Sequence, residues 1–283
     1  MIPHDTITSA ANPRVRQAAL LRQADARRQT GLTLVDGRRE LAKASAAGVP
    51  IVDIFLDARV IQTSSIHADS VELDRWLNEL CEKGTRIVSL SPKAFDRIAF
   101  GGRNEGCVGV VAFAAQSLER LTLSADCPVL LVEGIEKPGN LGAILRTADA
   151  TGMAGVIVCD GRTDPANPAV IRASLGTVFT VPLAFASSDQ VIDWCHAGGR
   201  RVAAAMPTGE RLWHQAHLAG NVAILLGSEA HGISPLWQQA AALKTISFTS
   251  IRLPMVGSAD SLNVSATAAV LAYEALRQGT LTD

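Results

Sequence analysis

The sequence predicts an α/β protein of two domains. Apolar stretches alternate with helical stretches along most of the chain, which is the pattern of layered α/β packing. The chain has 283 residues, enough for two domains of about 100–200 residues each. Hydrophobic residues make up 48% of the chain and aromatic residues only 4%. Aliphatic side chains therefore supply most of the core.

Residues 1–113 form the first predicted domain, a small α/β unit. A helix is expected over 12–30, because Asn12 and Pro13 are typical of a helix start and Gly31 of a helix end. Further alternation predicts strands at 33–35, 51–56, 86–90 and 107–113, and helices at 38–47, 71–81 and 92–98.

Residues 114–127 interrupt the alternation and are expected to be a linker, followed by a second domain over 128–283. The second domain has expected strands at 129–133, 156–159, 202–205, 222–226 and 246–253, and helices at 140–152, 168–175, 189–197 and 234–243. These strands are apolar throughout, which predicts a parallel sheet covered on both faces. Apolar residues at helical spacing mark a last helix, in which Tyr273 is expected to face the core.

Several classes of protein are excluded by composition. Five cysteines are scattered singly, without a C-x-x-C pair, which argues against a disulfide framework and a zinc site and favours small buried residues. No apolar run approaches the roughly 20 residues of a membrane span, and the first residues lack the pattern of a signal peptide. The sequence thus predicts a soluble, cytoplasmic protein without a metal.

The positive charge is concentrated near the N-terminus. The net charge is −1, yet residues 1–50 hold eight basic and four acidic residues. Such a distribution fits a solvated helix face, and it also fits a surface that contacts phosphate groups. The charge alone does not separate these two interpretations.

Three segments of the second domain combine glycine with polar residues directly after an expected strand: 133–146, 226–232 and 251–265. Ligands of open parallel sheets bind outside the carboxyl ends of the strands. None of the three segments fits the Rossmann or the P-loop pattern. One such segment is explained by an ordinary turn, whereas three together favour a binding site.

The three segments resemble motifs 1, 2 and 3 of the SpoU (TrmH-type) RNA ribose methyltransferases, a family of the SPOUT superfamily. The matching stretches are Gly-Asn-Leu-Gly-Ala-Ile-Leu-Arg at 139–146, Leu-Gly-Ser-Glu at 226–229 and Ser-Leu-Asn-Val-Ser at 261–265. The order and spacing match over 129–278, and 167–176 resembles the stretch between motifs 1 and 2. Residues 1–113 resemble, less closely, an RNA-binding domain of ribosomal-protein type.

The resemblance implies transfer of a methyl group from S-adenosylmethionine to a ribose 2′-hydroxyl of structured RNA, without a metal. It also implies a deep trefoil knot in the C-terminal domain and a homodimer whose active sites form at the subunit interface. Ribosomal RNA is the expected substrate, because shorter family members that methylate transfer RNA often lack the N-terminal domain.

The resemblance also assigns residues. The cofactor pocket is expected to include Leu226, Gly227, Ile251 and Leu262, and the catalytic set is expected to be Asn140, Arg146, Glu229, Ser261 and Asn263. A guanidinium keeps its proton far above neutral pH, so phosphate anchoring and oxyanion stabilisation suit Arg146 better than base catalysis. Glu229 either orients Arg146 or accepts a proton. Arg252 and Lys137 are expected to be surface charges.

Three alternatives remain at this point: a transfer RNA 2′-O-methyltransferase, a non-catalytic RNA-binding protein on the same scaffold, and a nucleotide-dependent enzyme of ordinary doubly wound fold. The target nucleotide and its base also remain open, as does the choice between housekeeping modification and protection against an antibiotic.

Overall fold

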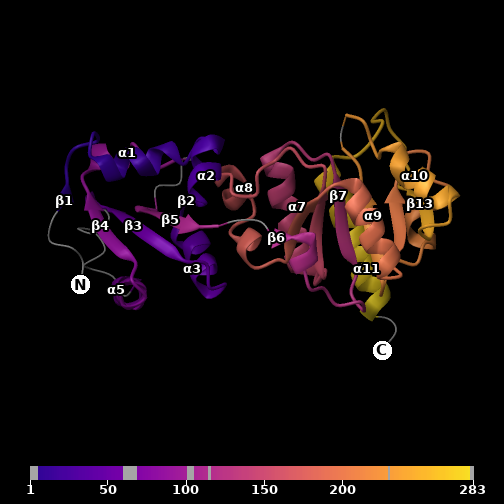
Figure 1. Ribbon diagram of the computed structural model, residues 1–283, viewed down its shortest axis with the longest axis horizontal. Coiled ribbons are helices and arrows are strands. Elements are labelled where there is room, and N and C mark those ends of the chain that lie inside the picture. The colour runs from indigo at the N-terminus through magenta and orange to yellow at the C-terminus, as the bar shows by residue number, and fades with distance from the viewer. Residues whose placement is uncertain (1–5, 60–68, 101–104, 114–115, 229, 281–283) are drawn as a thin grey trace. The chain divides into compact units, whose positions relative to one another are not determined.

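The computed structural model describes residues 6–59, 69–100, 105–113, 116–228 and 230–280 (Figure 1). The chain divides into two compact units. The N-terminal unit holds Met1–Ala114 together with Pro165–Thr180, and the C-terminal unit holds Ala115–Asp164 together with Val181–Asp283. Each unit has a sheet of its own.

The N-terminal unit is built on a five-stranded sheet in the order β1-β4-β3-β5-β2. β5 runs antiparallel to both of its neighbours, and the other pairings are parallel. Its strands are β1 (Thr6–Ile7), β2 (Leu32–Asp36), β3 (Ile51–Asp57), β4 (Arg86–Leu90) and β5 (Cys107–Ala112). Its helices are α1 (Pro13–Leu20), α2 (Ala24–Thr30), α3 (Arg38–Ala46), α5 (Asp69–Glu82), α6 (Pro92–Phe95) and α8 (Pro168–Ala173).

The helix expected over 12–30 is in fact two helices, α1 and α2. Both predicted ends are confirmed, since the Asn12 side chain caps α1 and Gly31 ends α2 with φ +66°. Between the helices, the buried Arg27 guanidinium donates to the carbonyl oxygens of Leu21 and Arg22. The Arg27 side chain thus supplies hydrogen-bond donors to the carbonyl groups at the break between the helices. The apolar pattern of the sequence does not predict such a contact.

Residues 165–180 lie in the middle of the second predicted domain, yet they pack within the N-terminal unit. The Thr33 hydroxyl donates to the carbonyl oxygen of Ala166. The rings of Phe113 and Phe179 meet edge to face with their centroids 5.0 Å apart. These contacts join residues far apart in sequence, so a linear reading of the chain does not reveal them.

The C-terminal unit confirms the expected parallel sheet. Its eight strands are ordered β11-β13-β10-β12-β7-β8-β9-β6, and every pairing is parallel. The expected strands are present as β7 (Val129–Glu133), β8 (Gly155–Cys159), β10 (Arg201–Ala205), β12 (Val222–Leu226) and β13 (Phe248–Arg252).

Three strands of this sheet were not predicted: β6 (Gln116–Ser117), β9 (Leu183–Ala186) and β11 (Arg211–Leu212). They hold only two to four residues each, which is too short for a recognisable apolar pattern. β6 lies inside the expected linker and pairs with β9. The linker region therefore contributes an edge strand to the sheet.

Helices α7 (Pro138–Thr151), α9 (Ser188–Ala197), α10 (Pro235–Ala242) and α11 (Val264–Thr280) accompany this sheet. β7, β8 and β12 are buried along their whole length. Leu131 and Leu225 form one core cluster with residues of α9 and α10, including Trp237. Trp237 is 0% exposed, which confirms that it packs in the core. α7 packs against α11.

The expectation that Tyr273 faces the core is wrong, because its side chain is 55% exposed. The buried face of α11 instead carries Val264, Ala268, Leu271, Ala272 and Ala275. Both faces of α11 are apolar, so periodicity alone does not choose between them. The face with more alanine allows close helix packing, and the larger side chains Tyr273 and Leu276 are left outside.

Three cysteines, Cys107, Cys159 and Cys195, are buried as expected, whereas Cys81 is exposed. Burial raises the pKa of the Cys107 thiol to about 12, so this thiol remains protonated and packs as a small apolar group. In the described part of the chain, no helix combines the length and the apolar character needed to cross a membrane.

Asp36, at the end of β2, is a buried carboxyl group of the N-terminal unit. Its side chain is 3% exposed, and Oδ2 lies 3.7 Å from Nη1 of Arg172. Oδ2 also accepts a hydrogen bond from the Phe100 backbone N–H at 2.7 Å. Loss of hydration on burial raises the pKa of Asp36 to about 6, despite the opposing effects of Phe100 and Arg172. Glu105 and Glu40 add smaller upward contributions.

We therefore expect Asp36→Asn to alter how stability depends on pH. A carboxyl whose folded pKa is raised stabilises the folded state at low pH, and this contribution is lost as pH rises from the unfolded value of 3.8 towards about 6. Between pH 4 and 7, the free energy of unfolding of the native protein should fall on the order of 3 kcal/mol relative to that of Asp36→Asn. Thermal unfolding of both proteins across this range measures the difference, and parallel curves would contradict the assignment.

Candidate functional site

The carboxyl ends of four neighbouring strands meet at one edge of the C-terminal sheet. Leu226, the last residue of β12, pairs with Ala205 of β10 on one side and with Val132 of β7 on the other. Ala205 in turn pairs with Ile251 of β13. The three segments singled out in the sequence follow β7, β12 and β13, so they lie at the same edge of the sheet.

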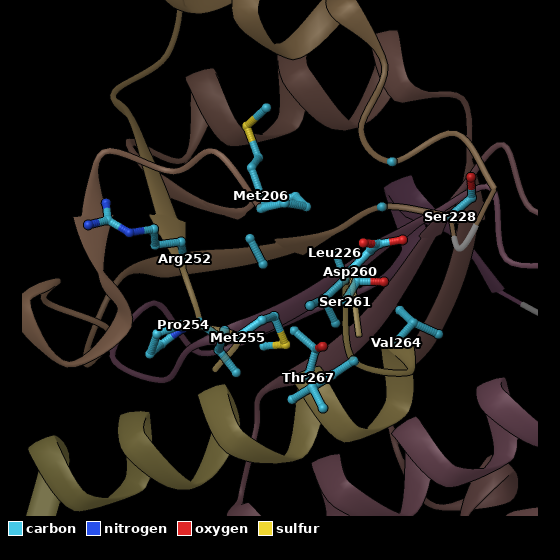
Figure 2. Close-up of a pocket in the computed structure, with 16 residues that line it drawn as sticks. Met206, Leu226, Ser228, Arg252, Pro254, Met255, Asp260, Ser261, Val264 and Thr267 are labelled. Atoms are coloured by element: carbon cyan, nitrogen blue, oxygen red, sulfur yellow. The ribbon is translucent and has the colours of Figure 1, made fainter. Parts of the chain in front are cut away.

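A cavity of about 560 Å³ opens at this edge (Figure 2). Ligand sites of proteins commonly measure about 300–1,000 Å³. The lining comes from the ends of β10 and β12 and from the stretch between β13 and α11. It comprises Ala205, Met206, Pro207, Leu226, Gly227, Ser228, Gly232, Arg252, Leu253, Pro254, Met255, Asp260, Ser261, Leu262, Val264 and Thr267.

Three of the expected cofactor residues, Leu226, Gly227 and Leu262, line this cavity. Ile251 does not line it, but it is 0% exposed in β13 and supports the strand from which the lining segment continues. Ser261, expected in the catalytic set, also lines the cavity. The structure thus gathers these residues from two distant segments into one wall.

The lining combines apolar side chains, among them the thioethers of Met206 and Met255, with polar groups in similar measure. Arg252 points its guanidinium away from the other labelled side chains (Figure 2). Its Nη1 donates to the carbonyl oxygens of Gly209 and Glu210, so Arg252 tethers a loop and is not the free surface charge expected. Asp260 is the second charged side chain among the described lining residues. It is not used to hold the loop at Gly209 and Glu210.

A second cavity of about 190 Å³ lies beside the first and shares Gly227, Ser228 and Val264 with it. Asn140, in the first turn of α7, lines this smaller cavity. Nδ2 of Asn263 donates to Oδ1 of Asn140 at 3.3 Å, and Oδ1 of Asn263 accepts from the Ser265 backbone N–H at 2.9 Å. The two asparagines are 123 positions apart in sequence, and the fold brings them into contact.

Arg146 lies apart from both cavities. It follows Asn140 by six residues in α7, which places it about 9 Å further along the helix and turned by roughly 120°. Its side chain is exposed, while its neighbours Ile144 and Leu145 are buried. Within one chain, the structure does not bring Arg146 to the other expected catalytic residues.

Glu229 lies outside the described residues, and the residues on either side of it form a closed turn. The backbones of Ser228 and Gly232 exchange two hydrogen bonds of 3.0 Å each. A side chain on Gly227 would overlap the backbone of Gly232, and Gly232 itself has φ +67°. These glycines let the chain fold back on itself at the rim of both cavities.

Sequence reasoning missed several residues of this edge. Asp260, Met206 and Thr267 line the larger cavity, and Glu133 ends β7 with a buried carboxylate. An acidic residue at the end of an otherwise apolar strand was the available signal for Glu133. Among the described residues, no group of three histidine, cysteine or acidic side chains is arranged to hold a metal ion.

Not all arginines near the N-terminus are available to a ligand. Arg22 donates to the carbonyl oxygens of Ile98 and Ala99 and lies over the ring of Phe100. Arg27 is buried. Arg14, Arg16 and Arg39 are exposed, so the positive surface is smaller than the sequence count indicates.

Comparison with known proteins gives two family matches. Residues 128–273 match the SpoU rRNA Methylase family. Residues 12–109 match the MRM3-like substrate binding domain.

Individual relatives cover most of the chain. A 23S rRNA (uridine(2479)-2′-O)-methyltransferase from Streptomyces viridochromogenes is 30% identical over 95% of this chain and 91% of its own. The 23S rRNA (guanosine-2′-O-)-methyltransferase RlmB from Vibrio cholerae is 33% identical over 71% of this chain and 82% of its own. An AdoMet-bound rRNA methyltransferase from Sinorhizobium meliloti is similar in structure, with a TM-score of 0.82 and 25% identity over 96% of this chain and 97% of its own.

We expect Gly227→Ala to disrupt the loop at the cavity rim. The added methyl group overlaps the Gly232 backbone, and such overpacking costs about 1–3 kcal/mol of stability. Gly139→Ala is the matched control, because a methyl group there meets no atom within 4 Å. Denaturant unfolding of both variants measures the effect. Equal stability of the two variants would contradict the close approach of Gly227 to Gly232.

Proposed function

The chain belongs to the SpoU rRNA methylase family, and on that premise we propose that it transfers the methyl group of S-adenosylmethionine to a ribose 2′-hydroxyl of structured RNA. Ribosomal RNA is the proposed substrate, since both named 23S rRNA relatives methylate that RNA on the ribose. A substrate in ribosomal RNA also favours a cytoplasmic location. The observation that carries the proposal is the cavity of about 560 Å³ formed by the second and third motifs at the edge of the parallel sheet.

The cavity suits S-adenosylmethionine in size and in chemistry. It offers apolar surface for a purine ring, backbone groups of Leu226 to Ser228 at one wall, and the carboxylate of Asp260. When bound, S-adenosylmethionine supplies an electrophilic methyl group on a positively charged sulfur. An acidic side chain among polar and apolar lining groups is compatible with a cationic ligand that carries an apolar ring.

In this proposal, side chains of the three motifs orient the ribose and stabilise charge. Asn140 and Asn263, in contact at 3.3 Å, present amide groups that can hold hydroxyl groups of the substrate in line with the methyl donor. Arg146 anchors a phosphate group and stabilises negative charge on the 2′-oxygen as its proton leaves. Ser261 lines the cofactor cavity, and Glu229 orients Arg146 or accepts the proton.

We also propose that the active enzyme is a homodimer. Tyr273, Leu276 and Leu262 leave 55%, 37% and 42% of their surface exposed. Tyr273 and Leu276 lie on the outer face of α11, and the apolar stripe is continued by Val270, which is half-buried. Arg146 is exposed on α7, the helix packed against α11. A second subunit seated on this face would cover the apolar stripe and bring an active site together across the interface.

We propose that the C-terminal domain contains the deep trefoil knot of the SPOUT superfamily. The Gln278 side chain accepts from the Leu218 backbone N–H at 2.7 Å and donates to the Ala216 carbonyl oxygen at 2.9 Å. These bonds tie the end of α11 to a segment about 60 residues earlier. The knot itself is proposed from membership of the SpoU family.

The N-terminal domain, residues 1–113, is proposed to bind the RNA substrate. The match of residues 12–109 to a substrate binding domain supports this role. Arg14, Arg16 and Arg39, which are exposed, are the candidates for phosphate contacts. Such contacts weaken as salt is added, because the bound counterions of the RNA are released on binding.

The activity is tested with RNA from cells that lack the protein. Calorimetry should give one S-adenosylmethionine site per chain, and a labelled methyl group should enter ribosomal RNA. A 2′-O-methyl group removes the hydroxyl that attacks the adjacent phosphate, so the labelled linkage should resist alkaline hydrolysis. Label in transfer RNA would favour the transfer RNA alternative. Cofactor binding without any transfer would favour the non-catalytic one.

Arg146→Ala should lower turnover on the order of 100-fold or more, because an oxyanion donor is lost. Arg146→Lys should be nearly as damaging, since lysine lacks the bidentate fork. Cofactor affinity should change little in both variants, because Arg146 lies apart from the cavity. Single-turnover kinetics and calorimetry measure the two effects. Turnover near that of the native protein in Arg146→Ala would remove Arg146 from the catalytic set.

Tyr273→Glu should dissociate the dimer by placing an unpaired charge in an apolar interface. The dimer dissociation constant should rise on the order of 100-fold, which sedimentation equilibrium measures. Leu243→Glu is the matched control, because Leu243, which directly follows α10, is 79% exposed and lies outside the stripe. Equal self-association of both variants would show that α11 is not the interface.

A further inference from the structure

Glu133 is a buried acidic residue that the proposed chemistry does not use. It ends β7 and is 5% exposed. Oε1 accepts hydrogen bonds from the Ser188 hydroxyl at 2.8 Å, the Ser234 hydroxyl at 2.7 Å and the Trp237 indole N–H at 3.1 Å. Oε2 accepts from the Ser234 backbone N–H at 2.7 Å. A buried carboxylate is costly unless donors surround it. Four donor groups face Glu133, of which the Ser188 hydroxyl also faces Oδ2 of Asp160 at 2.6 Å and has one proton for the two carboxylates.

Two of these four donors belong to Ser234, where the loop 227–233 ends and α10 begins. The loop starts at the buried Leu226 of β12, and its middle is closed by the backbone pair of Ser228 and Gly232. Glu133 is therefore the group that fixes the far end of the loop. Residues of the same loop line both cavities.

The backbone next to Glu133 also touches this loop. A methyl group on Gly134 would lie 3.2 Å from Cβ of Ser228, which is tighter than an ordinary contact. The starts of the first and second motif segments are thus packed together at Gly134 and Ser228. Glu133 links their position to that of α10 through Ser234.

We propose that Glu133 is a positioning residue for cofactor binding: it holds the described loop residues 227–228 and 230–233 in the conformation that lines the cavity. This inference rests on the proposed function. Glu133 lines neither cavity, so it acts through the loop and not by contact with the cofactor. If the loop has the binding conformation in only a fraction of the molecules, the apparent dissociation constant equals the intrinsic constant divided by that fraction.

Glu133→Gln separates this role from simple packing. Glutamine has the same shape but a single acceptor oxygen. If that oxygen keeps the three donors at the Oε1 position, the amide NH₂ group faces the Ser234 backbone N–H, and two donors oppose each other. The substitution therefore keeps the side-chain volume and weakens the contact that holds the end of the loop.

The test measures binding of S-adenosylhomocysteine to the full-length protein by calorimetry. Glu133→Gln should raise the dissociation constant about tenfold or more, because the loop is no longer pre-ordered. Ser234→Ala loses one of the two Ser234 contacts and should raise it by about twofold to fivefold. If Glu133→Gln does not fold, as judged by circular dichroism, Ser234→Ala decides the question.

Ser188→Ala is the control, because it removes a hydroxyl on α9 that Glu133 shares with Asp160 and that lies away from the loop. It should lower the melting temperature and leave the dissociation constant unchanged. Native affinity in Glu133→Gln and in Ser234→Ala overturns the inference, and so does a loss in Ser188→Ala equal to that in Glu133→Gln. Failure of the native protein to bind S-adenosylhomocysteine overturns the proposed function instead, and the inference with it.

Discussion

Backbone hydrogen bonds pair β12 with β10 and β7 in a register that places the carboxyl ends of the three strands at the same edge of the sheet. The candidate site is built on that edge. Because Leu226 pairs with both Ala205 and Val132, the segments that follow β7 and β12 leave the sheet side by side. A shift of register by one residue would turn the buried side chains of these strands to opposite faces. The core and the site therefore depend on the same pairing.

The cavity is shaped by backbone and by apolar and polar side chains in similar measure. Gly227 allows two stretches of backbone to touch, where a side chain would separate them. Asn140 lines the adjacent cavity, and its side chain accepts a hydrogen bond from Asn263. In the proposed function, this arrangement would separate holding a cofactor from orienting a substrate.

α11 contributes to the molecule in two ways because both of its faces are apolar. Ala268, Ala272 and Ala275 face the interior of the unit, whereas Tyr273 and Leu276 face outward. A monomer gains nothing from the outward apolar face, and a second subunit would gain from covering it. The exposed position of Arg146 on the adjoining helix fits the same explanation, since one chain alone leaves it outside both cavities.

The sequence by itself determined the α/β class, the parallel sheet of the C-terminal unit and the segments that line the cavity, because long apolar strands and glycine-containing turns are local patterns. It did not reveal β6, β9 and β11, which are too short for a pattern, nor the break at Leu21, which Arg27 stabilises from the next helix. Tertiary structure decided which face of α11 is buried, where residues 165–180 pack, and that four donors surround Glu133. Each of these depends on contacts between residues distant in sequence, for which local periodicity holds no information.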